Sequence, residues 1–290
     1  MLEKTLIQKI KAEFPRIEWK EYKFLSHGWD HFAIILDNKI VFRSPKKASD
    51  NLKNELYNEA GLLRYLKQKV AVGIPEYIYI SKDKSLAGYK MLSGTELEPS
   101  FFESLSDAAK EKIAKQLANF ISTLHATPKY VIKEFNVEES KPQKDYTALT
   151  DNSKKLLFPK LDKKEVQMIK KFLKELKTTL DHKYSNVLIH TDLKWEHLLW
   201  NTEKNKLNII DFSDREFGDP ATDFTSLWAF GNKFTNRVYE LYEGKKDEKF
   251  LYRSQLYFKK IPLLVMQGVI EGYPLSFEEA HKMFRQRFET

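Results

Sequence analysis

The hydrophobic residues of the first third of the chain fall in short runs rich in β-branched and aromatic side chains, a pattern typical of strands. These runs span residues 22–25, 32–36, 39–43, 74–80 and 86–92. Asp37 and Asn38 stand between two of the runs and favour a tight hairpin turn. Leucines spaced among charged residues over 51–69 predict a helix, as does the amphipathic pattern of residues 1–10. The pattern therefore predicts a β-rich region that carries two helices.

After Gly94 the hydrophobic pattern takes on helical periodicity. Ser106 is placed to cap a helix whose apolar residues fall on one face, namely Ile113, Leu117, Phe120, Ile121 and Leu124. The same periodicity over 166–180 predicts a second helix, and the tail from Phe224 onward also reads as helices. The polar, proline-bearing segment 127–160 predicts irregular or only partly helical structure.

Three strand-like runs interrupt the helical region, at residues 187–190, 197–200 and 207–210. The last two flank a polar turn and predict a β-hairpin. The sequence as a whole therefore predicts an α+β fold with two lobes. A β-rich N-terminal lobe would span residues 1–92, and a mainly helical C-terminal lobe with one inserted hairpin would span residues 93–290.

Two loops beside these strands carry aspartates in a significant order. The chain reads His190-Thr-Asp192-Leu-Lys-Trp-Glu-His197 in the first loop and Asp211-Phe-Ser in the second. Protein kinases have His-Arg-Asp-Leu, three further residues and Asn, followed by Asp-Phe-Gly. Phosphoryl transfer needs a carboxylate that orients the attacking hydroxyl, and oxygen or nitrogen ligands for Mg²⁺. The motifs therefore predict a protein-kinase-like fold, with Asp192 as catalytic base and with His197 and Asp211 as Mg²⁺ ligands.

This stretch resembles the aminoglycoside phosphotransferase family, and in particular its 2″-O-phosphotransferase branch. The resemblance rests on residues 190–200 and 209–214 and on the run Gly218-Asp-Pro-Ala-Thr-Asp-Phe224. Family members have a similar histidine where protein kinases have asparagine, so His197 matches the family. Asp219 and Asp223 are predicted to cap the following helix and hold the loop rather than to act in catalysis.

The resemblance extends over the N-terminal lobe and implies where ATP or GTP would bind in the cleft between the lobes. It implies the following nucleotide-binding residues: Ser26 and Gly28 in a phosphate-covering turn, Arg43 and Glu59 as a phosphate-positioning pair, and Lys90 and Leu92 as backbone partners of the purine. The family has lysine at the position of Arg43. Macrolide phosphotransferases, a sister group, carry arginine in a similar setting, so Arg43 is compatible with activity. Lys46 or Lys47 could also reach the phosphates.

The resemblance implies that the acceptor is a hydroxyl of an aminoglycoside-type antibiotic, whose phosphorylation gives resistance. Aminoglycosides are polycations, and Asp214 and Glu216 are the expected acceptor-binding carboxylates. Segment 252–260 is basic, however, where the 2″ enzymes carry glutamates. Because 13% of the residues are aromatic, a macrolide or another metabolite is the alternative acceptor. A third hypothesis, motivated by Arg43, is an inactive kinase-fold binding module.

Composition narrows the class of protein further. The chain has 290 residues, of which 42% are hydrophobic and 31% charged, as in folded globular proteins. No apolar run approaches the ~20 residues of a membrane span. The net charge of +8 is spread along the chain without a dense basic arm, so we expect no nucleic-acid partner. Zero cysteines fit a reducing cytoplasm. We expect a cytoplasmic monomer whose partners are a nucleoside triphosphate and a small-molecule acceptor.

Overall fold

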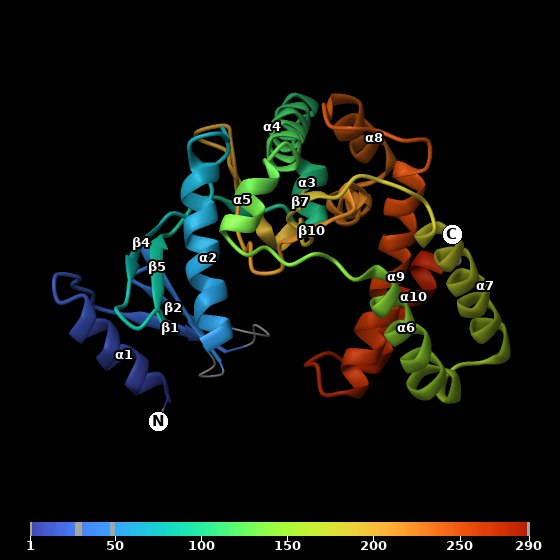
Figure 1. The fold of residues 1–290 in the computed structure, drawn as a ribbon, viewed down its shortest axis with the longest axis horizontal. Helices are drawn as coiled ribbons and strands as arrows, with labels where there is room; N and C mark the ends of the chain where they lie inside the picture. The colour runs from blue at the N-terminus through green and yellow to red at the C-terminus, as the bar shows by residue number, and fades with distance from the viewer. Residues whose placement is uncertain (1, 27–30, 47–49, 289–290) are drawn as a thin grey trace.

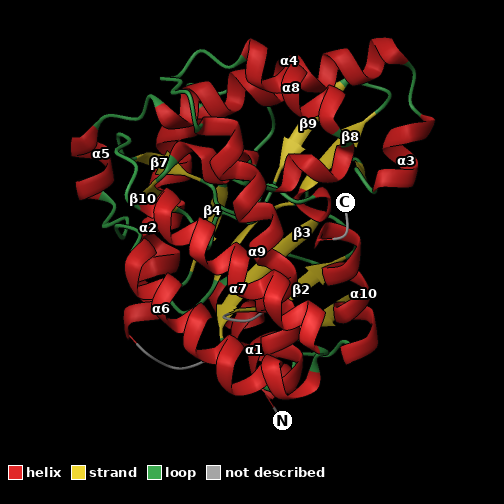
Figure 2. Ribbon diagram, turned by 90° about the vertical axis from the view of Figure 1, so that its right-hand side faces the viewer, coloured by secondary structure: helices red, strands yellow, loops and turns green. Residues whose placement is uncertain are grey.

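The computed structural model describes residues 2–26, 31–46 and 50–288 and has an α+β fold. An antiparallel sheet occupies the N-terminal region, and helices make up most of the remainder (Figure 1). The view turned by 90° shows the strands lying behind a layer of helices from the second half of the chain (Figure 2). The predicted fold class is therefore confirmed, while the division between residues 92 and 93 stays a prediction.

The N-terminal sheet has the strand order β1-β2-β3-β5-β4, with antiparallel neighbours throughout. Its strands are β1 (Tyr22–Leu25), β2 (His31–Leu36), β3 (Ile40–Pro45), β4 (Tyr77–Ile80) and β5 (Ala87–Lys90). Asp37 and Asn38 join β2 to β3 with φ values of 48° and 52°. This left-handed backbone suits a tight hairpin turn, as the sequence predicts.

Two helices flank this sheet, and the alternation of side chains along β3 separates two cores. Phe42 packs with residues of α1 (Leu2–Glu13), including Leu6 and Ile10. Its neighbour Val41 belongs instead to the main core, together with Leu56 of α2 (Asp50–Lys67). The main core continues without a break into the C-terminal helices, so the two parts of the molecule are packed against each other.

Strand β4 begins later than the sequence predicts, at Tyr77 rather than at Ile74. The backbone before it pairs elsewhere: the Gly73 amide donates to the Leu207 carbonyl at 3.0 Å, and the Ile209 amide donates to the Gly73 carbonyl at 2.8 Å. Glycine is required there, because a Cβ would lie 1.8 Å from Asn208 Oδ1. The segment therefore joins the N-terminal sheet to the C-terminal hairpin.

The helical region begins with α3 (Pro99–Ser104) and α4 (Asp107–His125). Ser106 caps α4 by accepting a hydrogen bond from the Ala109 amide, and the predicted apolar face of this helix is buried. Segment 127–160 is partly helical, as predicted: it forms two α-helices, a π-helical turn and a 3-10 turn, with a non-helical stretch at 135–141. The remaining helices are α5 (Lys129–Glu134), α6 (Pro142–Asn152), α7 (Lys163–Leu180), α8 (Asn232–Leu241), α9 (Phe250–Ile270) and α10 (Phe277–Phe288).

Two small sheets lie between the N-terminal sheet and these helices and carry the predicted catalytic loops. The hairpin of β8 (Leu198–Asn201) and β9 (Lys206–Ile209) pairs with β6 (Thr95–Glu96). Strand β7 (Val187–Ile189) pairs with β10 (Glu216–Gly218). None of the helices in the described residues is long and apolar enough to cross a bilayer.

Candidate active site

The buried carboxylate of Asp223 holds the loop that follows β7. Asp223 is 1% exposed and accepts hydrogen bonds from the His190 amide at 3.1 Å and the Thr191 amide at 2.8 Å. Its Oδ2 also lies 3.0 Å from His125 Nε2. Thr191 has a φ of 74°, which is unusual for a β-branched residue and needs such support. Asp223 therefore positions the loop that carries Asp192, as the sequence predicts.

Asp192 lies at the end of this loop beside two cationic or basic groups. Its Oδ2 is 2.9 Å from Lys194 Nζ and 3.3 Å from His197 Nδ1. Burial opposes the charge of Lys194, but the negative charge of Asp192 prevails and raises the pKa of Lys194. Sequence reasoning assigned Lys194 no role, and its only signal was a position two residues after Asp192.

The structure brings His197 and Asp211 together. His197 Nδ1 lies 2.9 Å from the Asp192 carbonyl oxygen, which can only accept, so this nitrogen donates. In the neutral ring Nε2 then carries the lone pair, and it faces Asp211 Oδ2 at 3.5 Å. A nitrogen lone pair and a carboxylate oxygen directed at each other suit a shared cation.

Asp211 stays ionised because of its neighbours. Burial would raise its pKa, but the Arg43 guanidinium and a hydrogen bond from Ser213 Oγ hold the pKa of Asp211 well below its usual range. Arg43 Nη2 lies 3.6 Å from Asp211 Oδ1. Asp211 itself has a φ of 64°, a backbone conformation found mainly where the surroundings enforce it. An ionised carboxylate at this place is what a Mg²⁺ ligand requires.

Arg43 and Glu59 form the expected ion pair across β3 and α2. Arg43 Nη1 donates to Glu59 Oε1 at 2.8 Å, and Glu59 is 1% exposed. Tyr77 connects the two, because its hydroxyl accepts from Arg43 at 3.0 Å and donates to Glu59 at 2.9 Å. Arg215 approaches the other Glu59 oxygen at 3.7 Å. Tyr77 and Arg215 were not identified from the sequence, because neither stands in a recognisable motif.

The other predicted nucleotide-binding residues lie around the same region. Lys90 is the last residue of β5 and is exposed. Leu92, two residues later, is half-buried. The Met91 amide donates to the Lys39 carbonyl at 2.7 Å, so strand alternation directs the amides of Lys90 and Leu92 away from β3.

The phosphate-covering turn is described only in part. Ser26 is exposed, and its carbonyl accepts a hydrogen bond from Lys46 Nζ. Gly28 and Lys47 lie outside the described residues. Of the two lysines proposed to reach the phosphates, Lys46 is therefore occupied with the backbone of Ser26.

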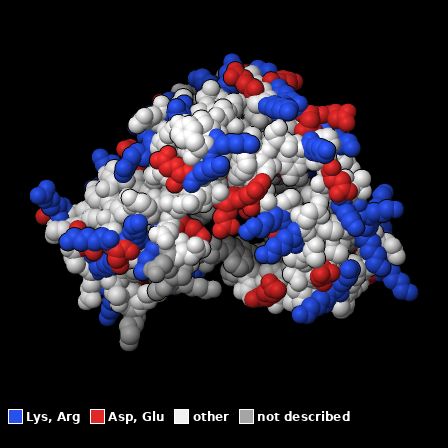
Figure 3. Space-filling view, viewed as in Figure 1, with Lys and Arg blue, Asp and Glu red and all other residues white. Residues whose placement is uncertain are grey.

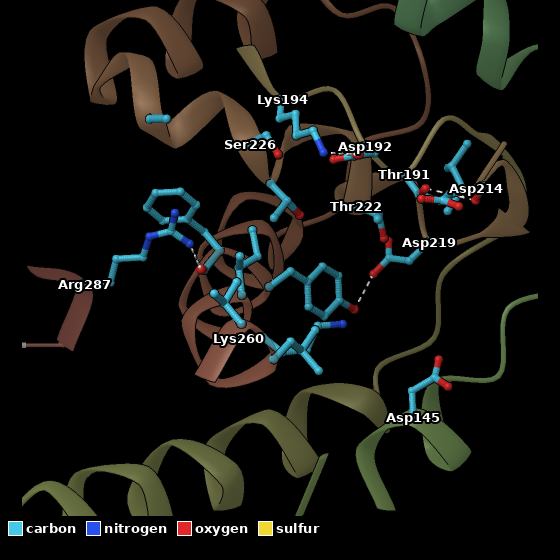
Figure 4. Close-up of a pocket in the computed structure, with 18 of the residues that line it drawn as sticks. Asp145, Thr191, Asp192, Lys194, Asp214, Asp219, Thr222, Ser226, Lys260 and Arg287 are labelled. Atoms are coloured by element: carbon cyan, nitrogen blue, oxygen red, sulfur yellow. Dashed lines mark hydrogen bonds and ion pairs between the residues drawn. The ribbon is translucent and has the colours of Figure 1, made fainter. Parts of the chain in front are cut away.

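A cavity of about 940 Å³ opens beside Asp192, bordered by α9 and by α6 (Figure 4). The predicted acceptor residues Asp214 and Glu216 both line it. So does Asp145 of α6, which sequence reasoning missed because its segment showed no clear pattern. In the space-filling view acidic side chains gather in the middle of one face, above the hollow between the two parts of the molecule (Figure 3). The cavity volume of about 940 Å³ is within the usual range for small-molecule sites.

The walls of the cavity are not uniformly acidic. Burial and the nearby charge of Asp145 raise the pKa of Glu216. Burial lowers the pKa of Lys260, against the opposing charges of Asp145 and Glu216. The apolar part of the lining includes Tyr146, Tyr184, Trp195, Phe258, Ile261 and Leu264. The cavity therefore combines carboxylates, the cationic side chains of Lys194, Lys260 and Arg287, and a broad apolar wall.

Asp219 borders the cavity, but its side chain is already committed. It caps the turn at Pro220–Phe224 by accepting from the Ala221 amide. It also pairs with Arg253 at 2.7 Å and accepts from the Tyr257 hydroxyl at 2.8 Å. These contacts fit the predicted structural role.

The donor set fits a magnesium ion that arrives with a nucleotide. Within the described ranges there is no cluster of three or more His, Asp or Glu side chains able to hold a metal alone. Mg²⁺ is commonly bound through one or two protein groups plus substrate phosphates and water. Asp211 Oδ2 and His197 Nε2 would supply the protein's share.

Comparison with known proteins agrees with this geometry. The model of the phosphotransferase enzyme family matches residues 21–253. A curated relative, the uncharacterized protein YcbJ of Bacillus subtilis (strain 168), is 24% identical over 216 residues, which cover 70% of this chain and 67% of the relative.

This chain is also similar to solved structures of phosphotransferases. The structure of the GDP and kanamycin complex of APH(2″)-IIIa is 26% identical, with a TM-score of 0.87 over 98% of each chain. Macrolide 2′-phosphotransferase type I shares the fold, with 17% identity and a TM-score of 0.67 over 100% of this chain and 96% of that one. Through the family match over most of its length, this chain belongs to the phosphotransferase enzyme family.

Proposed function

We propose that this phosphotransferase moves the γ-phosphoryl group of ATP or GTP to a hydroxyl of an aminoglycoside-type antibiotic and so gives resistance. One observation carries the proposal: Asp192 stands between the cavity and the His197–Asp211 pair. A hydroxyl held in the cavity would meet the carboxylate on one side. The phosphates would lie on the other side, next to the Arg43–Asp211 ion pair.

Each residue near Asp192 then has a defined task. Asp192 accepts a hydrogen bond from the acceptor hydroxyl and takes its proton as the hydroxyl oxygen bonds to the γ-phosphorus; the bond from that phosphorus to the β-phosphate oxygen breaks, and the nucleoside diphosphate leaves. Lys194, at 2.9 Å from Asp192, places a positive charge beside the phosphoryl group in transit. Arg43, fixed by Glu59, positions the phosphates from the N-terminal side.

The metal site is proposed on the same grounds. Mg²⁺, when bound, would neutralise charge on the phosphates. Asp211 and His197 are the residues that would hold it, since their facing atoms are 3.5 Å apart. The Nδ1 hydrogen bond to the Asp192 carbonyl keeps His197 oriented and links the metal ligands to the base.

The acceptor is proposed from the charges of the cavity. Asp145, Asp214 and Glu216 would attract the amino groups of an aminoglycoside. The kanamycin-bound structure, at 26% identity, supports this class. Lys260 and the apolar wall favour a second candidate, a macrolide, which has one amine and much apolar surface. We also propose that the protein acts as a cytoplasmic monomer without a nucleic-acid partner.

A panel assay tests the acceptor class. Nucleoside triphosphate turnover is measured with ATP and with GTP, alone and with individual aminoglycosides and macrolides, for the wild type, Asp192→Ala and the exposed control Asp181→Ala. Turnover stimulated by aminoglycosides and lost only in Asp192→Ala supports the first candidate, and stimulation by macrolides alone supports the second. Nucleotide binding without any stimulated turnover would instead favour the binding module.

A further inference from the structure

His31 stands beside Arg43 although no motif singles it out. It opens β2, where the register pairs it with Pro45 and pairs Ala33 with Arg43. Residues two apart along a strand share a face, so His31 and Arg43 lie on the same face of the sheet. His31 Nδ1 is 3.3 Å from Arg43 Nη2. The histidine therefore borders the region between Arg43 and Asp211.

The contact with Arg43 fixes the proton on the imidazole ring. A guanidinium can only donate, so His31 Nδ1 must accept. Burial and the charge of Arg43 lower the pKa of His31 to about 3, and the ring is neutral near pH 7. A neutral ring that accepts at Nδ1 carries its proton on Nε2. Nε2 is therefore a hydrogen-bond donor that points away from Arg43.

Within the described part of the chain, this donor lacks an acceptor. His31 Nε2 is buried, and none of the described residues offers it a hydrogen-bond partner. An unpaired buried donor is costly, so native structures rarely keep one without a reason. The positive charges of Arg43 and Arg215 act on the ring, opposed by the negative charge of Asp211. A donor in such a field suits an anionic ligand.

Arg43 itself has little capacity left for phosphate. Its Nη1 donates to Glu59 and to the Tyr77 hydroxyl, while Nη2 faces His31 and Asp211. A lysine ammonium at this position could bind a glutamate and keep donors for phosphate. A neighbouring donor would therefore add to the few N–H groups that Arg43 can still offer a phosphate.

We propose that His31 Nε2–H donates a hydrogen bond to a phosphate oxygen of the bound nucleoside triphosphate. Arg43 and His31 would then act as a pair: Arg43 supplies the charge and fixes the tautomer, and His31 supplies the directed donor. This inference rests on the proposed function, because it requires that the triphosphate binds next to Arg43 and Asp211.

Two substitutions separate the two ring nitrogens. His31→Asn places an amide near Nδ1 and can still accept from Arg43, but it offers nothing at the position of Nε2. His31→Gln places its amide near Nε2 and keeps the donor. Dissociation constants are measured for a non-hydrolysable triphosphate analogue and for the corresponding nucleoside, with thermal melting as a check on folding.

We expect His31→Asn to bind the triphosphate about tenfold more weakly, because a hydrogen bond to a charged group is lost. His31→Gln should stay near the wild type, and both variants should bind the nucleoside as the wild type does. Equal weakening in both variants, or a parallel loss for the nucleoside, would overturn the inference. A wild type that binds no triphosphate would instead refute the proposed function.

Spectroscopy of the wild type keeps the inference testable if either variant fails to fold. A long-range ¹H–¹⁵N spectrum should show His31 protonated at Nε2, with a shift of that resonance when the triphosphate analogue is added but not with the nucleoside. A proton on Nδ1, or a resonance indifferent to the triphosphate, would contradict it.

Discussion

At the scale of single residues, Arg43 shows how a departure from a family pattern is accommodated. Its guanidinium is surrounded by an acid, a phenol and an imidazole, namely Glu59, Tyr77 and His31. Two of these three side chains, Tyr77 and His31, accept from guanidinium N–H groups other than the one that pairs with Glu59. The neighbouring side chains therefore form specific hydrogen bonds with the arginine at this position.

Replacement of Arg43 by methionine should weaken both folding and triphosphate binding. Glu59, which is 1% exposed, would lose its closest partner and keep only the Tyr77 hydroxyl at 2.9 Å and Arg215 at 3.7 Å among the contacts described above. We expect a loss of about 1–3 kcal/mol in the free energy of unfolding. Urea denaturation measures it, and Arg64→Met at an exposed position of α2 is the control. An unchanged midpoint for Arg43→Met would show that the pair does not stabilise the fold.

At the scale of elements, the catalytic loop depends on contacts that cross the chain. Asp223 receives the amides of His190 and Thr191 and also touches His125 at the end of α4. Three separate segments thus meet at one carboxylate.

Substitution of Asp223 by asparagine should reduce kcat more than it changes nucleotide affinity. The amide would direct N–H groups at one of the backbone N–H donors, and Thr191 would lose support for its strained backbone. We expect kcat to fall by about tenfold to a hundredfold, since misplacement of a catalytic group costs about that much. Steady-state kinetics with a separate nucleotide dissociation constant checks this. A rise in that constant with kcat intact would contradict the positioning role.

A second contact between elements should depend on pH. Glu165 of α7 closes a capping box with Asp162 and binds His281 and Arg285 of α10. Burial would raise its pKa, but a hydrogen bond from the Asp162 amide and the Arg285 and His281 side chains lower the pKa of Glu165. Because the folded-state value is depressed, the stabilisation is present above about pH 4 and is lost as pH falls through that lower value.

Glu165→Gln tests this contact. We expect it to lower the free energy of unfolding by about 1–3 kcal/mol at pH 7. The difference from the wild type should shrink as the pH is lowered below about 4. Chemical denaturation at a series of pH values measures both. A penalty that grows on acidification would mean that the carboxylate is not held ionised by its partners.

The sequence was informative where chemistry is local. The turn at Asp37 and Asn38, the cap at Ser106 and the order of Asp192, His197 and Asp211 are written in neighbouring residues, and the elements and loops they predict are present. The late start of β4 was not predictable, because the Gly73 backbone forms hydrogen bonds with a hairpin more than a hundred residues away in the sequence. Only contacts made by the fold identify four further residues of the site, namely Asp145, Lys194, Tyr77 and His31.

At the scale of the whole molecule, the acceptor cavity lies where α6, α9, α10 and the catalytic loop converge. The chain carries a net charge of +8, yet acidic groups gather in the middle of the face shown in Figure 3. Lys260 interrupts this acidity from the wall formed by α9, with its Nζ 5.4 Å from the centre of the Tyr257 ring. Its charge is expected to help decide which acceptors enter.

Reversal of that charge should favour polycationic acceptors. Lys260→Glu would join Asp145 and Glu216 in one negative patch, and we expect kcat/KM for aminoglycosides to rise about tenfold relative to macrolides. Lys259→Glu is the matched control, because Lys259 precedes it on α9 but does not line the cavity. The ratio of kcat/KM values measures the change. Equal ratios in the two variants would show that the charge of Lys260 does not face the acceptor.

The central claim is that Asp192 delivers the acceptor hydroxyl to the γ-phosphate. Transfer of a γ-phosphate label to an acceptor in a single turnover, at saturating nucleotide, tests it most directly for the wild type and Asp192→Asn. The account predicts a rate lower by about 10² to 10⁴, as for loss of a general base, with the nucleotide dissociation constant unchanged. Label transfer by Asp192→Asn at the wild-type rate would contradict it.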